Sequence, residues 1–196
     1  MERLINRVVS GHANPRDLTA LRESLAALPE VLGALAELPD LAAEWVGKVT
    51  PCESELILLQ QAIAENPPAT LSNTGVINPG FSTELDQIIQ TSRHAREWIA
   101  GLEAVERERT GIKTLKVGYN KVFGYYLEIT HSNTEAVPAD YIRKQTLVNA
   151  ERYITPEMKE YEAIVLNAEE RIHEVERRVY KDVCEQLSQS YGKIMN

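Results

Sequence analysis

The sequence contains only two cysteines, Cys52 and Cys184, among its 196 residues. Two cysteines that lie 132 positions apart exclude both a disulfide framework and a Cys-x-x-Cys metal site. This usage favours a reducing, cytoplasmic setting. The N-terminal residues 1–4 lack the apolar stretch of a secretory signal peptide. No apolar run approaches the roughly 18 residues of a membrane span, so no membrane partner is expected.

Motifs that carry chemistry are also missing. The sequence has no Gly-x-x-x-x-Gly-Lys-Ser/Thr phosphate loop and no Gly-x-Ser-x-Gly nucleophile motif. Its four histidines lie far apart, and none belongs to a metal-binding pattern. Glu106, Glu108 and Glu160 could be imagined as paired carboxylates, but we interpret them as a solvated helix face that alternates with arginines. We therefore expect no active site, no metal and no cofactor within this chain.

The sequence has no overall positive charge. Acidic residues outnumber basic ones by 29 to 21, and the resulting net charge of −8 excludes a generally basic nucleic-acid coat. The charge is uneven, however, because residues 111–153 hold six basic and four acidic side chains. The same segment holds 6 of the 12 aromatic residues and 3 of the 10 glycines. A short, aromatic-rich and slightly basic segment within an acidic chain indicates an inserted module.

The part of the chain before this module is predicted to be helical. Asn14-Pro15 is typical of a helix start, and Pro29 is predicted to end that helix. A second short helix is expected to follow and to end at Pro39. Thr50-Pro51 predicts the start of another helix, which Asn66-Pro67-Pro68 would close.

Two longer helices flank the module. Apolar residues recur at spacings of three and four from Ser82 or Thr83 to Gly111, which predicts a helix of about 27 residues. Thr155-Pro156 predicts the start of a helix of about 35 residues, with no breaker before Gly192. Neither helix can bury its apolar stripe alone. We therefore expect the two to pack as an antiparallel hairpin.

Between these helices the spacing of apolar residues changes from three or four to two. Residues 115–119 and 125–129 alternate in polarity, which predicts two strands joined by a hairpin with Asn120-Lys121 near its tip. One helical turn is expected at 140–144 and a third strand at 145–149.

These elements together predict a mainly α fold with a small inserted antiparallel β module. Long antiparallel helices would carry the module at their tip. The predicted segments are residues 1–110, which are helical, residues 111–154, which form the β insertion, and residues 155–196, which form the returning helix.

The β module offers side chains suited to a nucleic-acid backbone. Lysine and arginine can neutralise phosphates, and asparagine can hydrogen-bond phosphate oxygens. On the other interpretation the tyrosines fill the core of a small sheet while the lysines solvate its outer face, and for the tyrosines we favour this one. Composition favours neither interpretation for Asn120, Lys121 and Asn149. Arg143-Lys144 could instead pair with Asp140.

Several motifs, taken in their order along the chain, resemble one known family. They are Glu106–Ile112, Leu115–Asn120, Gly124–Tyr126, Tyr141–Leu147 and Asn149–Glu157, preceded by Asn14–Leu18 and Leu25–Pro29. Together they resemble the core (lever) and clamp region of the MutS family of bacterial DNA mismatch-repair proteins. The resemblance covers nearly the whole chain.

The resemblance implies a fold and a function. In this family long lever helices run from an ATPase domain to a small β clamp, which holds the DNA backbone and does not read base edges. The DNA-binding residues implied by matching motif positions are Asn120, Lys121 and Asn149 and, as looser transfers, Arg143, Lys144 and Arg152.

The family's other parts have no counterpart in this sequence. These parts are the Phe-x-Glu mismatch-reading domain, the Walker ATPase and the dimerising C-terminal domain. The chain therefore looks like a fragment that is not itself an enzyme. For the full-length protein the resemblance implies ATP and Mg as cofactors, double-stranded DNA with mismatches as ligand, a homodimer, and MutL as repair partner.

Two alternatives remain open from the sequence. The chain could be a helical scaffold or interaction module whose β tip binds a protein partner through Phe123, Tyr125 or Tyr126. It could also be the clamp of a MutS homologue that acts on branched DNA.

Overall fold

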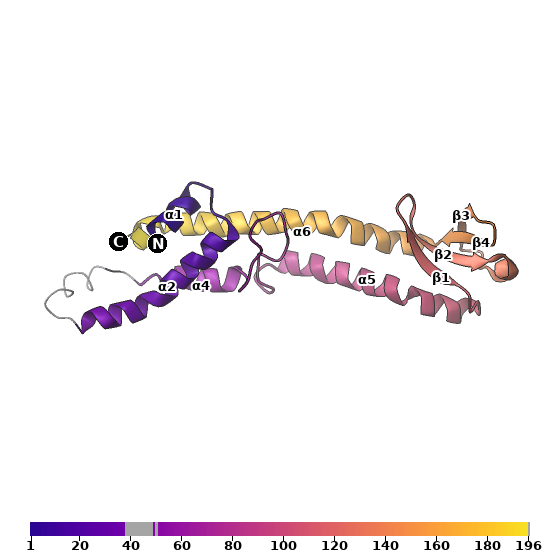
Figure 1. The fold of residues 1–196 in the computed structure, drawn as a ribbon, viewed down its shortest axis with the longest axis horizontal. Helices are drawn as coiled ribbons and strands as arrows, with labels where there is room; N and C mark the ends of the chain where they lie inside the picture. Colours follow the sequence, from indigo (N-terminus) through magenta and orange to yellow (C-terminus); the bar gives the residue numbers. More distant parts are fainter. Residues whose placement is uncertain (38–48, 50, 196) are drawn as a thin grey trace. The chain divides into compact units, whose positions relative to one another are not determined.

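The computed structural model describes residues 1–37, 49 and 51–195 (Figure 1). The chain forms two compact units, unit 1 with residues 1–86 and 172–196 and unit 2 with residues 87–171. The three segments predicted from composition remain a prediction, since the compact units are defined by packing. The elements are α1 (Glu2–Val9), α2 (Pro15–Ala36), α4 (Glu53–Ala62), α5 (Thr83–Thr110), β1 (Lys116–Asn120), β2 (Gly124–Thr130), η1 (His131–Ala136), β3 (Ile142–Thr146), β4 (Ala150–Ile154), α6 (Pro156–Gln189) and α7 (Tyr191–Met195).

Within the described ranges, no helix combines the length and the apolarity that crossing a bilayer would require. The two longest helices, α5 and α6, each pass from one unit into the other.

The start of α2 in unit 1 confirms the helix signal at Asn14-Pro15. The Asn14 side chain accepts a hydrogen bond from the Asp17 N–H at 3.0 Å, and the Asp17 carboxylate accepts one from the Asn14 N–H at 2.8 Å. This reciprocal capping box satisfies donors that a helix start leaves free. The predicted end at Pro29 is wrong, because α2 continues through it to Ala36. Pro29 is exposed, so water can bond the carbonyl that its missing N–H leaves free.

The other helix boundaries predicted for unit 1 are not confirmed. The short helix expected after Pro29 is part of α2, and Pro39, its predicted end, lies outside the described residues. Thr50 also lies outside them, and α4 begins at Glu53 and not at Pro51. Glu53 stands in the first turn of α4, where the helix dipole favours a negative charge.

One buried carboxylate of α6 anchors the loop between α4 and α5. Glu176 is 4% exposed, and its carboxylate accepts hydrogen bonds from the N–H groups of Gly75, Val76 and Ile77 at 2.7 to 3.1 Å. Consecutive N–H groups that point at one acceptor form a concavity that binds an anion. The carboxylate thereby ties this loop to α6 within unit 1.

A second buried carboxylate of unit 1 joins α4 to α7. Glu55 accepts a hydrogen bond from the Lys193 ammonium at 2.7 Å. Burial by itself would raise the pKa of Glu55, but hydrogen bonds from Lys193, Ser190 and Ser54 outweigh burial and lower this pKa to about 2.

Replacing Glu55 with glutamine is expected to lower the free energy of unfolding by about 2 kcal/mol at pH 7. The pKa of Glu55 is about 2 in the folded chain and near 4.5 when unperturbed, so its carboxylate stabilises the fold above about pH 4.5. This stabilisation is lost as the pH falls through about 2. Urea unfolding of wild type and variant between pH 7 and pH 2 measures the difference, which is expected to shrink below about pH 4.5. The control Glu53→Gln removes an exposed charge from the same turn and should cost only its interaction with the helix dipole, about 0.5 kcal/mol. A pH-independent difference between wild type and Glu55→Gln would contradict the prediction.

In unit 2, α5 and α6 pack antiparallel, as the sequence predicted. The Trp98 ring stacks on the Tyr161 ring with centroids 4.1 Å apart, and Arg96 pairs with Glu169 at 3.2 Å. The later residue of α6 meets the earlier residue of α5, which fixes the antiparallel direction.

The ends of these helices also match their sequence signals. Residue Gly111, which follows α5, has a φ of +73°, the left-handed conformation of a helix stop. At the start of α6 the Thr155 hydroxyl accepts a hydrogen bond from the Met158 N–H at 3.0 Å. The mainly α fold with an inserted antiparallel β module is therefore confirmed.

The module is one four-stranded antiparallel sheet with strand order β1-β2-β4-β3. The β1–β2 hairpin confirms the alternation, but the helical turn at 140–144 and the strand at 145–149 are wrong. The chain there forms β3 at 142–146 and β4 at 150–154. The edge strand β3 is exposed at every residue, and its register slips between Arg143 and Gln145. It therefore shows no alternation of polarity from which a strand could be predicted.

The core of unit 2 lies between one face of the sheet and the helices. Tyr141 and Tyr153 are buried in it and Tyr125 packs partly against it, which confirms the core interpretation for these three tyrosines. The interpretation is wrong for Tyr119, which is 54% exposed. The buried members are Leu102, Ile112, Leu115, Leu127, Ile129, Tyr141, Tyr153 and Met158.

Candidate nucleic-acid interface

The turn between β1 and β2 carries Asn120 and Lys121, as predicted. The Asn120 side-chain oxygen accepts a hydrogen bond from the Val122 N–H at 2.7 Å, which folds the turn. Lys121 is exposed, and its ammonium makes no ion pair with any residue in the described part of the chain. The turn therefore presents one uncompensated positive charge on an ordered backbone.

The first turns of α6 hold this β1–β2 turn in place. The Lys159 ammonium donates to the Phe123 carbonyl at 2.6 Å, and the Glu162 carboxylate accepts from the Tyr125 N–H at 3.1 Å. Lys159 and Glu162 also form an ion pair with each other. Gly124 has a φ of +84°, and a Cβ built there would lie 1.5 Å from a Glu162 carboxylate oxygen. The positive φ favours glycine here, and any larger side chain would displace the Glu162 carboxylate.

Sequence reasoning missed Lys159 and Glu162. Both residues lie outside the apolar stripe of their helix, and their spacing of three residues is common on solvated helix faces. Glu162 is only 6% exposed in the structure. No local signal could have shown this, because the groups that cover it come from the β hairpin.

Asn149 lies at the opposite end of the sheet, in the turn between β3 and β4. It is exposed, and its backbone carbonyl accepts a hydrogen bond from the His131 N–H at 3.2 Å. Asn149 precedes Ala150, the partner of Thr130 at the end of β2, whereas Asn120 pairs with Gly124 at the start of β2. At about 3.3 Å per residue the two candidate groups lie roughly 20 Å apart.

Arg152 stands in the middle of the sheet and is held by its neighbours. Its guanidinium donates to the Glu128 carboxylate at 2.9 Å and to the Gln145 side-chain oxygen at 3.0 Å. It also lies over the Tyr126 ring, 4.2 Å from the centroid. The structure therefore places Arg152 in a network on the outer sheet face and away from both turns.

The remaining predicted residues lie on the edge strand β3. Arg143 pairs with Glu151 at 3.3 Å, whereas Lys144 is exposed at the register slip and makes no ion pair with the described residues. The alternative pairing of Arg143-Lys144 with Asp140 is wrong, because Asp140 pairs with Arg109 at 3.1 Å.

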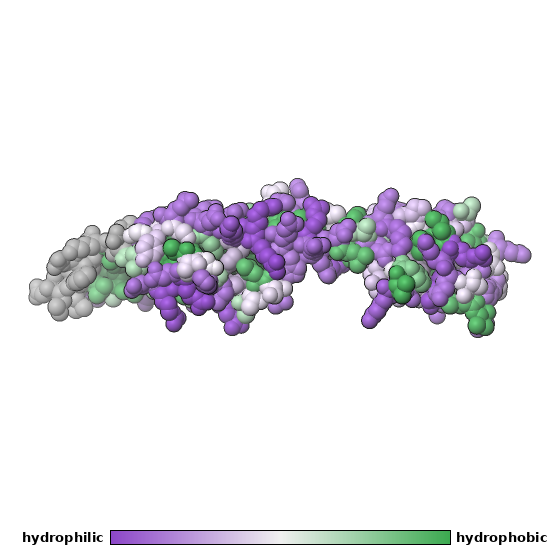
Figure 2. All heavy atoms as spheres, turned by 90° about the horizontal axis from the view of Figure 1, so that it is seen from above, coloured by the Kyte–Doolittle hydropathy of each residue, from purple (hydrophilic) through white to green (hydrophobic). Residues whose placement is uncertain are grey.

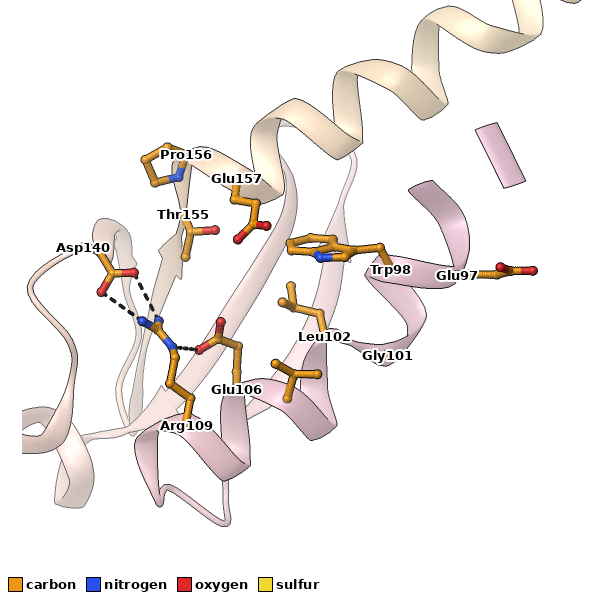
Figure 3. Close-up of a pocket in the computed structure, with 11 residues that line it drawn as sticks. Glu97, Trp98, Gly101, Leu102, Glu106, Arg109, Asp140, Thr155, Pro156 and Glu157 are labelled. Carbon is orange, nitrogen blue, oxygen red and sulfur yellow. Dashed lines mark hydrogen bonds and ion pairs between the residues drawn. The ribbon is translucent and has the colours of Figure 1, made fainter. Parts of the chain in front are cut away.

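A buried network joins the end of α5 to the loop before β3 (Figure 3). Glu106 accepts hydrogen bonds from the Tyr141 hydroxyl and the Arg109 guanidinium, each at 2.7 Å. Burial and the Glu106 carboxylate raise the pKa of Tyr141 above its usual range. The interpretation of Glu106 as part of a solvated face is therefore wrong for this residue. Its partner Tyr141 is 35 positions away, beyond the reach of a helix pattern.

A cavity of about 520 Å³ opens beside this network. Trp98 and Leu102 are apolar residues of its lining, and the Glu157 carboxylate points toward them whereas the Glu97 carboxylate points away (Figure 3). Among the described residues no group of three or more His, Cys, Asp or Glu side chains could hold a metal ion.

These features define a class of protein module. Two antiparallel helices carry a small antiparallel sheet, and the two turns at opposite ends of that sheet present exposed polar side chains. The β1–β2 turn is fixed directly on one of the helices.

The comparisons with known proteins agree with this class. Residues 80–171 match the model of MutS family domain IV. The chain is 48% identical to the DNA mismatch repair protein MutS of Pelotomaculum thermopropionicum over 99% of its own length and 23% of that protein. It is 44% identical to the MutS of Methanosarcina mazei and 45% identical to that of Symbiobacterium thermophilum, over 96% and 99% of its length.

The chain therefore belongs to the MutS family. It spans about a fifth of the length of the curated relatives that it matches, 21% to 23% in these three comparisons.

Proposed function

We propose that unit 2 is a clamp that binds the backbone of double-stranded DNA. The observation that carries the proposal is the β1–β2 turn, which lies within the match to MutS domain IV. Contacts with α6 fix the backbone of this turn. The turn presents Asn120 and the Lys121 ammonium, which has no ion-pair partner among the described residues. A cation and an amide next to each other suit neighbouring phosphate oxygens and carry no base code. Asn149 would make a second backbone contact at the far end of the sheet, and Lys144 a third on its edge.

The contributions of the two arginines are smaller in this proposal. Arg143 and Arg152 each have a carboxylate partner within the sheet, so a phosphate would have to compete with that partner. We assign them a secondary role, in which each arginine holds its strand in place through Glu151 or Glu128.

The helices α5 and α6 act as levers in this proposal. Because Lys159 bonds the Phe123 carbonyl and Glu162 accepts from the Tyr125 N–H, a displacement of the start of α6 moves the β1–β2 turn with it. In the full-length protein we propose that this coupling links DNA binding to an ATPase domain that uses ATP and Mg, in a cytoplasmic homodimer that recognises mismatched DNA and recruits MutL.

The double substitution Asn120→Ala with Lys121→Ala is expected to lower duplex affinity about five- to tenfold at low salt. Because one neutralised phosphate is lost, the slope of log K against log salt should become shallower by about 0.9. Fluorescence anisotropy with a labelled 30-base-pair duplex between about 20 and 200 mM salt measures both. It should be done on this chain and on the full-length product of its gene.

Lys181→Ala is the matched control, because it removes one exposed lysine of α6 in unit 1 and should leave both quantities unchanged. Unchanged affinity and slope in the Asn120→Ala/Lys121→Ala protein would refute the clamp assignment. A four-way junction in the same assay tests the branched-DNA alternative, which predicts tighter binding to the junction than to the duplex.

The protein-partner alternative relies on exposed aromatic side chains. Phe123, Tyr125 and Tyr126 are each half-buried, and Tyr126 lies beneath Arg152. This burial favours the DNA clamp over a protein-docking tip.

A further inference from the structure

Two valines stand out on the surface of unit 2. Val122 is 91% exposed and Val148 is 92% exposed, whereas no other exposed large hydrophobic side chain of the described residues exceeds 60%. Figure 2 shows hydrophobic atoms standing among hydrophilic ones at the end of the picture that holds the sheet. Tight turns favour glycine, asparagine, aspartate and serine. A branched apolar residue at such a position leaves nearly its whole side chain in water.

The two valines occupy equivalent places at opposite ends of the sheet. Val122 lies in the β1–β2 turn directly after Lys121, and Val148 lies in the β3–β4 turn directly before Asn149. Each apolar side chain thus adjoins a residue that we propose as a backbone contact.

Both valines are presented by ordered turns. The Val122 N–H is bonded to the Asn120 side chain at 2.7 Å. The turn that holds Val148 is closed by a hydrogen bond from the Leu147 N–H to the Ala150 carbonyl at 2.8 Å. These ordered turns would lose little conformational entropy on binding, and this lowers the free-energy cost of contact with a ligand.

The surface around the valines suits DNA better than a protein. A protein partner that recognises apolar groups needs a contiguous apolar patch. These two side chains lie roughly 20 Å apart along the sheet, with polar residues between them. A duplex backbone, in contrast, presents charged phosphates alternating with apolar faces of deoxyribose at every step, so both valines can find the same chemistry.

We infer that Val122 and Val148 pack against deoxyribose groups of the DNA backbone, beside the phosphates held by Lys121 and Asn149. This inference rests on the proposed clamp function. It assigns to each turn an apolar contact that complements its polar one, and the pair fixes the position of the backbone along the sheet.

The test replaces each valine by threonine, which has nearly the same shape but puts a hydroxyl in place of a methyl group. Val122→Thr and Val148→Thr are each expected to weaken duplex binding about three- to fivefold, and the double variant about tenfold or more. The salt slope should stay unchanged because no charge is removed. The heat-capacity change of binding, measured by titration calorimetry at several temperatures, should become less negative because less apolar surface is buried.

Val105→Thr is the matched control, since Val105 is 60% exposed on α5 and lies outside both turns. Circular dichroism melting checks that the variants remain folded, and Val→Ala at the same positions serves if a threonine variant unfolds. If the double variant keeps the wild-type affinity and heat-capacity change while Asn120→Ala/Lys121→Ala flattens the salt slope, the valine contact is overturned and the clamp stands. If neither double variant alters binding, the clamp itself fails.

Discussion

Replacing Glu176 with alanine is expected to lower the free energy of unfolding of unit 1 by about 4 kcal/mol. The substitution removes the only acceptor that the structure shows for the N–H groups of Gly75, Val76 and Ile77. Val76 and Ile77 are 0% and 5% exposed, so water cannot replace the carboxylate without opening the loop. Each buried N–H left without a partner costs about 1 to 3 kcal/mol.

Urea unfolding followed by circular dichroism measures the total loss. Native-state hydrogen exchange at the Val76 and Ile77 amides should show the loss locally, with protection falling there first. Glu174→Ala removes an exposed carboxylate from the same helix and should change stability by less than about 0.5 kcal/mol. Glu176→Gln keeps one acceptor oxygen, so its free energy of unfolding should lie between those of the Glu176→Ala and Glu174→Ala proteins. Equal stability of the Glu176→Ala and Glu174→Ala proteins would show that the loop is held by other contacts.

Replacing Gly124 with alanine is expected to destabilise unit 2 by about 3 kcal/mol. A side chain at a φ of +84° costs about 1 to 2 kcal/mol by itself. The new Cβ would also lie 1.5 Å from the Glu162 carboxylate, so this group must move away and its hydrogen bond to the Tyr125 N–H is lost. Because that bond fixes the β1–β2 turn, DNA affinity should fall together with stability.

Thermal melting followed by circular dichroism measures the loss of stability, and duplex anisotropy measures the loss of affinity. Gly101→Ala is the matched control, because Gly101 lies in the interior of α5 with no heavy atom within 4 Å of a built Cβ. Alanine there should stabilise the helix by about 0.5 to 1 kcal/mol. Removing the obstructing carboxylate in Gly124→Ala/Glu162→Ala should make the two changes non-additive. Strict additivity would rule out a steric conflict between the two residues.

The parts of the fold that could be predicted from sequence depend on short-range interactions. The starts at Asn14-Pro15 and Thr155-Pro156 and the stop at Gly111 were predicted correctly because a helix cap is decided by three or four neighbouring residues. The β1–β2 hairpin followed from alternation, since both strands have one face on the core.

The errors have a common cause in contacts between residues distant in sequence. Glu106 looked solvated because its partner Tyr141 lies in a loop 35 positions away. The boundaries predicted for β3 were wrong because this strand is exposed along its whole length and shows no alternation of polarity. The helix end predicted at Pro29 was wrong because an exposed proline can be accommodated within a helix.

The candidate site was predicted in its residues but not in its arrangement. Asn120, Lys121 and Asn149 were all named, and the structure places them in two turns at opposite ends of one sheet. Arg152 was named with them, yet the sheet holds it between Glu128 and Gln145. The strand register decides which charged side chains of the sheet form ion pairs with one another. Local composition does not determine this register.

The sequence by itself determined the mainly helical class, the positions of the two long helices and the location of the β module, because caps and periodicity act within a few residues. The scarcity of cysteine and the lack of catalytic motifs are likewise properties of the sequence alone, and they favour a binding role. Only the tertiary structure decided that Lys159 and Glu162 fix the β1–β2 turn and that Glu176 anchors the loop of unit 1. Only packing decides these roles, because each joins backbone groups to a carboxylate or ammonium from a distant part of the chain.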